Sequence, residues 1–124
     1  MKTENTEAIL LTSGMVTLPV PNGMESISIA EIVWAEGIDN YTQFHLINER
    51  KIGVARTLKY FEKAFFNSGF FRIHKSYLIN MNHARKYIHN GIHSVVMSDH
   101  SKIPLARRKQ HTFLSRFQHK LTVP

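Results

Sequence analysis

The sequence predicts a mainly β protein, and three observations indicate this fold class. Short apolar runs recur along most of the chain, several of them alternate apolar with polar residues, and turn-forming residues separate them. Two stretches, residues 57–66 and 106–121, have helical spacing instead. The 124 residues contain no internal repeat or long linker, so one domain is expected. We expect residues 1–13 to form a short N-terminal arm and residues 14–124 to form the domain.

The first part of the chain contains several expected strands. Asn22-Gly23 is a strong signal for a tight turn. Alternation places Thr42, Phe44 and Leu46 on one face of their strand. These runs supply much of the expected β structure, and they cover residues 15–18, 27–29, 32–34, 41–47 and 52–54.

A short helix is expected over residues 57–66. Thr57 can cap its N-terminus, and Leu58, Phe61 and Phe65 recur at the spacing of one helical face. The Asn-Ser-Gly sequence at residues 67–69 is a plausible end for the helix. We expect this helix to cover one end of a sheet.

Residues 70–82, FFRIHKSYLINMN, combine an apolar strand pattern with Arg72, His74 and Lys75. His74 and Lys75 are adjacent, so regular alternation would send them to opposite faces of a strand. They can therefore reach one partner together only at a strand end, a bulge or a loop. Such a strand would hold cationic and titratable groups rigidly at one surface.

Further strands are expected after this stretch, at residues 84–89, 92–97 and 102–105. Asn90-Gly91 suits a tight hairpin turn, and Pro104 is best tolerated in an edge strand. The C-terminal stretch predicts a basic amphipathic helix. The apolar face of this helix contains Ala106, Phe113, Leu114, Phe117 and Leu121. Elsewhere in the chain, Trp34 and Tyr77 are also expected to pack in the core.

Charge is distributed unevenly along the chain, whose formal net charge is +7. Residues 1–50 contain two basic and seven acidic residues, a net charge of −5. Residues 51–124 contain fourteen basic and two acidic residues, a net charge of +12, and seven of the eight histidines. This asymmetry favours an anionic partner, with nucleic acid first and an anionic membrane surface second.

Several function classes find no support in the sequence. Without cysteine, the chain offers neither disulfides nor thiolate ligands, and its histidines show no tight metal-binding pattern. A Gly-rich phosphate loop and a G-x-S-x-G motif are also missing, so we expect no enzyme, no metal and no cofactor. No apolar run is long enough for a membrane span, and the N-terminus lacks signal-peptide character, so a cytoplasmic protein is expected.

The motifs resemble those of the LytTR-type (LytR/AlgR family) DNA-binding domain of bacterial transcription regulators. FFRIHKSYLIN resembles that family's signature F-R-x-H-R/K-S-Y/F-L-V/I-N. Supporting segments occur in the family's order: EIVWAEGIDNY, VARTLKYFEKAF and KIPLARRKQ. The resemblance covers roughly residues 14–121 and implies an elongated, strand-rich fold that inserts loops into successive major grooves of double-stranded DNA. Members usually carry a receiver or membrane domain, and from this sequence we expect only the short arm before the domain.

The resemblance also implies which residues bind DNA. His74 and Lys75 match the family's groove-contacting pair, and the loop at residues 37–41 matches its first contacting loop, with Asn40 as the expected polar reader. The basic C-terminal segment is matched by Arg107, Arg108 and Lys109, and Arg56 is expected on a phosphate.

Two positions depart from the family pattern. Ala106 stands where the family usually has serine, which removes a helix-capping or phosphate-binding hydroxyl. Lys75 stands where arginine is common, and lysine lacks the planar fork for bidentate contact with guanine.

The charge pattern leaves other functions open. An RNA- or membrane-surface-binding module could use the same basic face, although its aromatic residues alternate as core residues rather than as a stacking platform. A protein-interaction module connected to a separate sensor or regulatory protein is another alternative. A homodimer on paired DNA sites is also compatible with the sequence.

Overall fold

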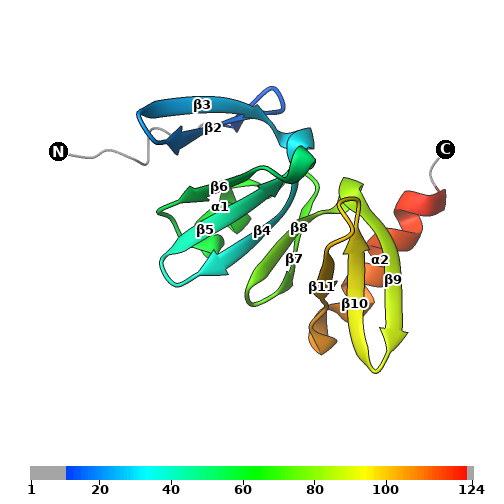
Figure 1. Ribbon diagram of the computed structural model, residues 1–124. Coiled ribbons are helices and arrows are strands. Elements are labelled where there is room, and N and C mark those ends of the chain that lie inside the picture. The colour runs from blue at the N-terminus through cyan, green and yellow to red at the C-terminus, as the bar shows by residue number, and fades with distance from the viewer. Residues whose placement is uncertain (1–10, 123–124) are drawn as a thin grey trace.

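The computed structural model of the protein describes residues 11–122, and Figure 1 shows it as mainly β. Ile9 and Leu10 of the expected arm lie outside the described residues. Short 3-10 turns join several elements, including η2 Ile29–Glu31 and η5 Arg107–Lys109. The strands and helices are β1 Leu11–Thr12, β2 Met15–Val20, β3 Gly23–Ser28, β4 Ile32–Ile38, β5 Tyr41–Leu46, β6 Lys51–Val54, α1 Leu58–Ala64, β7 Phe70–His74, β8 Tyr77–Asn80, β9 Ala84–Asn90, β10 Ile92–Met97, β11 Lys102–Pro104 and α2 Gln110–Thr122.

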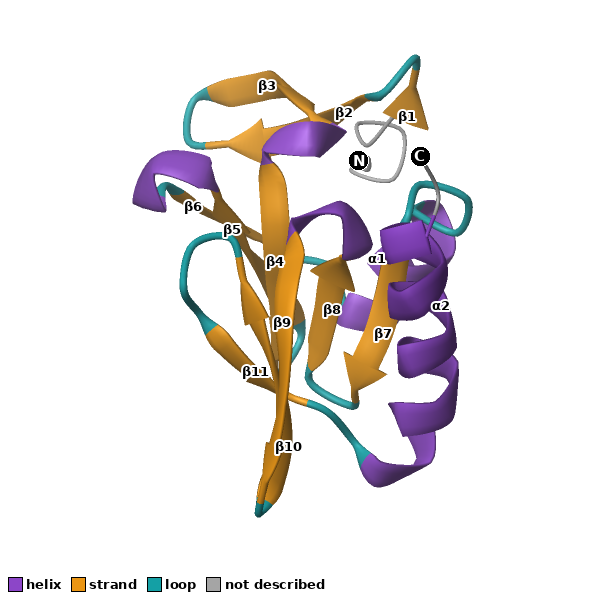
Figure 2. Ribbon diagram, turned by 90° about the vertical axis from the view of Figure 1, so that its right-hand side faces the viewer, coloured by secondary structure: helices purple, strands orange, loops and turns teal. Residues whose placement is uncertain are grey.

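The strands form three antiparallel sheets, of which the largest is central. The central sheet has five strands in the order β6-β5-β4-β8-β7. A three-stranded sheet, β1-β2-β3, precedes it, and another, β11-β10-β9, follows it. Figures 1 and 2 show the first small sheet at one end of the molecule and the last one beside α2. The central sheet therefore lies between an N-terminal and a C-terminal layer.

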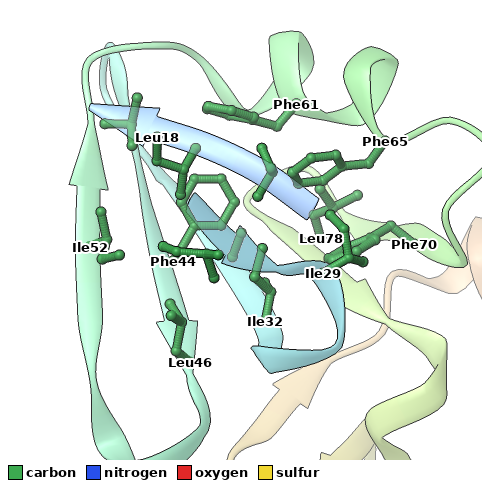
Figure 3. Packing of buried hydrophobic residues seen from close by; sticks show 14 of the residues in the cluster. Leu18, Ile29, Ile32, Phe44, Leu46, Ile52, Phe61, Phe65, Phe70 and Leu78 are labelled. Atoms are coloured by element: carbon green, nitrogen blue, oxygen red, sulfur yellow. The ribbon is translucent and has the colours of Figure 1, made fainter. Parts of the chain in front are cut away.

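One face of the central sheet packs against α1 and the β2–β3 hairpin (Figure 3). The Phe44 ring is fully buried at the centre of this face, 4.8 Å from the Phe61 ring of α1. As expected, Thr57 caps α1, since its Oγ1 accepts a hydrogen bond from the Tyr60 amide at 3.3 Å. The expectation that this helix covers an end of a sheet needs refinement, because it packs on a face. Its apolar side chains bury against the strands that the alternating pattern predicted.

The opposite face of the central sheet packs against the C-terminal sheet and α2. Phe113 of α2 is fully buried there and lies 6.2 Å from Phe71, measured between ring centroids. Leu114 and Phe117 are partly buried against the same cluster, which confirms the apolar face expected for the C-terminal helix. Leu121 of that expected face lies in a part of the helix whose side chains are outside the described set. Each face of the central sheet thus has its own hydrophobic cluster.

Trp34 connects the central sheet to the C-terminal sheet. Its Nε1 donates to Asp99 Oδ2 and Ser101 Oγ, each at 3.2 Å. Its ring lies parallel to the His45 ring, with centroids 3.7 Å apart and 4° between the planes. Burial of His45, reinforced by the charge of Lys51, lowers the pKa of this histidine below 6.5. The packing role expected for Trp34 is confirmed, because the side chain is only 9% exposed.

Residues 70–82 form a hairpin, whereas the sequence pattern suggested one strand. β7 ends at His74, Lys75 and Ser76 make the turn, and β8 begins at Tyr77. The strand β2 extends further than expected, because it covers residues 15–20 and includes Pro19. This is compatible with proline, because within residues 11–122 β1 pairs with Met15 and Val16 and no described strand pairs with Pro19 on that side of β2.

Two further findings concern the described part of the chain. Within residues 11–122, no helix is long and apolar enough to cross a membrane. The same residues contain no group of three or more histidine, cysteine, aspartate or glutamate side chains arranged to hold a metal ion.

Candidate nucleic-acid interface

The loops that contain predicted site residues lie along one side of the central sheet, at the ends of its strands. Antiparallel pairing places the end of β4 beside the start of β5, and the end of β7 beside the start of β8. The pairs Thr42↔Val54 and Glu36↔Tyr77 bring the end of β6 and the start of β8 to this same side. The turns at residues 39–40, 55–57 and 75–76 therefore project from one side of the sheet. We call this side the loop edge.

Hydrogen bonds join these turns and the C-terminal segment along the loop edge. The Gly37 amide donates to the Ser76 carbonyl at 2.9 Å, which connects the end of β4 to the β7–β8 turn. The Ala106 amide donates to the Ile73 carbonyl at 3.0 Å, which places the following basic turn, η5, beside the end of β7. Segments far apart in the sequence thereby form one connected surface.

Four of the seven predicted DNA-binding residues line one hollow at the loop edge. The hollow has a volume of about 210 Å³. Its predicted members come from the β7–β8 turn and from η5, and Ala106 lies between these two segments. The complete lining is Glu62, Arg72, His74, Lys75, Ala106, Arg108 and Lys109. Because five of these side chains can carry positive charge and only one is acidic, the hollow favours an anion.

His74 is held in a defined orientation by its own turn. The Ser76 amide donates to His74 Nδ1 at 3.0 Å, so Nδ1 supplies a lone pair and carries no proton. In the neutral ring the proton then resides on Nε2, which makes Nε2–H a hydrogen-bond donor. The pairing shifts between Arg72 and His74, as at a β-bulge, and this irregularity ends the regular alternation before the turn. His74 and Lys75 consequently reach the same hollow, as their adjacency required.

The basic C-terminal segment begins at the loop edge and leads into α2. Arg107 and Arg108 are exposed, and Lys109 is partly buried with its Nζ 5.7 Å from the centre of the Phe71 ring. Ala106 occupies the cap position of η5 and makes no side-chain capping bond, as its substitution for serine predicted. The three cations precede the N-terminus of α2, where positive charge opposes the helix dipole. A bound anion would relieve this unfavourable arrangement.

Three predicted residues do not line the hollow: Asn40 and Arg56 lie elsewhere on the loop edge, and Arg107 is at the start of η5. Asn40 is exposed in the β4–β5 turn, next to Asp39, whose φ is +52°. Arg56 lies between β6 and α1, where its guanidinium carbon is 5.1 Å from the centre of the Tyr60 ring. Thr42 Oγ1 donates to the Arg56 carbonyl at 2.8 Å and secures the backbone there. The predicted residues are thus spread along one edge rather than gathered at one point.

Sequence reasoning did not identify the ion pair that lies inside the hollow. Arg72 Nη1 donates to Glu62 Oε1 at 2.7 Å, and the Arg72 side chain is 19% exposed. The basic character of Arg72 was visible in the sequence, but its partner was not. Glu62 lies on α1 and Arg72 on β7, so only the packing of this helix on the sheet brings the two together.

Comparisons with known proteins agree with this architecture. A solved structure from Bacillus cereus, a LytTr DNA-binding domain, is similar with a TM-score of 0.66 and 20% identity over 90% of this chain and 100% of that one. The sensory transduction protein LytT of Bacillus anthracis is 26% identical over 94 residues, which are 74% of this chain and 38% of that protein. The model of the LytTr DNA-binding domain family matches residues 22–118. The chain therefore belongs to the LytTr DNA-binding domain family, which is DNA-binding and non-enzymatic.

Proposed function

We propose that this protein is a transcription regulator that recognises a specific sequence in double-stranded DNA through its loop edge. The observation that supports this most directly is the shared hollow, where His74 and Lys75 of one turn meet Arg108 and Lys109 of another segment. A rigid turn can position base-reading groups, while the neighbouring cations hold the phosphate backbone. Membership of a DNA-binding family supports DNA as the class of partner, and the arrangement of these side chains supports the choice of this surface.

Phosphate neutralisation is the part of the mechanism assigned to the cations. Arg108 lines the hollow and is exposed, as are its neighbour Arg107 and Lys75 of the β7–β8 turn. Lys109 and Arg56 contribute from more covered positions. Each phosphate contact releases counterions, so the logarithm of affinity falls by about 0.9 per contact for each tenfold rise in salt on B-DNA. These residues would determine binding strength on any duplex.

Base reading is assigned to His74 and Asn40, with Lys75 or Arg107 as further candidates. The Nε2–H of His74 can donate to the N7 or O6 acceptors that purines present in the major groove. Asn40 has both a donor and an acceptor, which suits adenine, and it lies exposed on a tight turn. Its neighbour Asp39 would repel a phosphate, which favours a position for this turn facing bases rather than the backbone.

Single-stranded RNA fits the described surface less well than duplex DNA. Its sequence-tolerant binders rely on rows of exposed aromatic rings. Among the residues whose side chains are described, the exposed large aromatic ones are Tyr41 and Phe66, and these lie on separate elements. This distribution gives no stacking platform.

Selection from random DNA duplexes, followed by sequencing, tests the proposal. A single recurring motif is expected, and two spaced copies of it would indicate binding as a homodimer. Competition against the labelled selected duplex then separates the alternatives, because single-stranded RNA and anionic vesicles should displace the protein less well than unlabelled duplex. Recovery of no preferred motif would rule out sequence-specific recognition. Displacement by single-stranded RNA or by anionic vesicles as effective as that by unlabelled duplex would contradict duplex DNA as the preferred partner.

A further inference from the structure

The guanidinium of Arg72 is engaged by three acceptors of the protein itself. Its Nε donates to the His74 carbonyl at 3.0 Å, and its Nη2 donates to the Lys75 carbonyl. Its Nη1 donates to Glu62 Oε1 at 2.7 Å. With three of its five N–H groups engaged within the protein and only 19% of the side chain exposed, Arg72 is poorly placed to bind a phosphate.

The acceptors show what this side chain does. The two carbonyls belong to His74 and Lys75, the residues at the start of the β7–β8 turn that line the hollow. A planar guanidinium holds two such oxygens in a fixed relation, which the single ammonium of a lysine cannot reproduce. Arg72 therefore braces the same turn in which the Ser76 amide orients the His74 ring.

Glu62 has a defined part in this arrangement. Of the residues that line the hollow, it is the acidic one, and a free carboxylate there would repel a phosphate. Its ion pair with Arg72 neutralises both groups and connects the turn to α1. The packing of α1 on the sheet therefore helps to fix the position of the β7–β8 turn.

From this geometry we infer that Arg72 is a positioning residue for base recognition, held in place by Glu62, rather than a DNA contact. The inference rests on the proposed function, because it assigns how the β7–β8 turn is kept in its reading conformation. Loss of the Arg72 hydrogen bonds should leave the phosphate-binding cations in place, while the His74 ring loses its fixed position. Selectivity should therefore fall without a change in the number of phosphate contacts.

Binding by the full chain is the first test, with the variants Arg72→Lys, Arg72→Met and Glu62→Gln. Affinity for the selected duplex and for a scrambled duplex is measured by fluorescence anisotropy over a range of salt. Arg50→Lys and Glu25→Gln serve as matched controls. That ion pair is also formed by an arginine and a glutamate, but it lies at the opposite edge of the central sheet, where Arg50 precedes β6. Thermal unfolding of each variant checks that it is folded.

Both Arg72 variants should lower the ratio of selected to scrambled affinity by about tenfold, with an unchanged salt slope on the scrambled duplex. Glu62→Gln should lower the same ratio, and the two control variants should leave it unchanged. A direct phosphate contact predicts a different pattern and would overturn the inference. In that case Arg72→Lys would behave like the original protein, while Arg72→Met would weaken all duplexes alike and reduce the salt slope by about 0.9.

A readout without DNA distinguishes failure of the inference from failure of the proposed function. Long-range ¹H–¹⁵N correlation spectra report which His74 nitrogen carries the proton. The Nε2–H form should dominate in the original protein, and Arg72→Lys should shift the ring toward a mixture of forms. An unchanged His74 tautomer in Arg72→Lys, together with unchanged selectivity, would overturn the inference alone. An original protein that shows no preference between duplexes would overturn the proposed function and this inference with it.

Discussion

The backbone amide of Ala106 donates a hydrogen bond to the carbonyl oxygen of Ile73 across 3.0 Å. This bond attaches the basic turn η5 to the end of β7, next to the turn that contains His74 and Lys75. Two stretches that are distant in sequence thus present their cations to the same hollow. The mutational predictions for DNA binding depend on this juxtaposition.

Replacement of Arg108 by alanine should weaken binding to every duplex. The side chain is exposed, lines the hollow and is assigned to a phosphate. The salt slope should therefore fall by about 0.9, while the ratio of selected to scrambled affinity is retained. Arg85→Ala is the matched control, because Arg85 is exposed at the start of β9, away from the loop edge. Equal losses in the two variants would contradict the assignment of Arg108.

Replacement of His74 by alanine should affect selected DNA far more than scrambled DNA. The lost Nε2–H donor should cost about 1–3 kcal/mol on the selected duplex, with little change in the salt slope. His111→Ala is a suitable comparison, since His111 is exposed on α2. A uniform loss on all duplexes would show that His74 contacts the backbone instead of a base.

Local sequence signals were sufficient for most of the elements. Alternation of Thr42, Phe44 and Leu46 identified a half-buried strand, and all three side chains are buried in the structure. The Thr57 cap and the spacing of Leu58 and Phe61 identified α1. These features depend on neighbours in the chain, which is why they can be recognised before any tertiary packing is known.

Tertiary relationships were not accessible in the same way. The turn at Lys75 and Ser76 contains neither glycine, proline nor asparagine, so nothing in its composition separated β7 from β8. The Glu62–Arg72 ion pair arises from the packing of α1 on the sheet and has no local signature. The motif resemblance predicted the candidate site residues one at a time, and the structure added which of them share a hollow.

Protein stability should contain a pH-dependent component from His45. Burial and the charge of Lys51 lower its folded-state pKa below 6.5, and these effects outweigh the opposing influence of Glu36 and Asp99. As pH falls through 6.5, the unfolded chain takes up a proton at this position before the folded one does. Stability is therefore lost as the pH falls and is fully present above 6.5.

Urea unfolding at about pH 7.5 and about pH 5.5 measures this component. The decrease in unfolding free energy between these conditions should be smaller in His45→Gln than in the original protein. His111→Gln should retain the full decrease, because this residue is exposed. An identical decrease in His45→Gln would exclude His45 as its source.

Replacement of Ala106 by serine should stabilise the protein. Ala106 has the extended backbone of a cap residue, with φ −62° and ψ 142°, but it makes no capping bond. A serine hydroxyl there can accept a free amide of the first turn, which contributes about 1 kcal/mol. Ala106→Val, which adds bulk without an oxygen, is the control. A serine variant no more stable than the valine variant would argue against capping.

The most direct test of the central claim is an NMR titration of the ¹⁵N-labelled protein with the selected duplex. DNA bound at the loop edge should perturb the backbone amides of residues 39–41, 74–76 and 106–109 most strongly. The amides of residues 47–50, at the opposite end of the strands of the central sheet, should change little. Perturbations concentrated on residues 47–50, with the loop edge unchanged, would contradict the proposed binding surface.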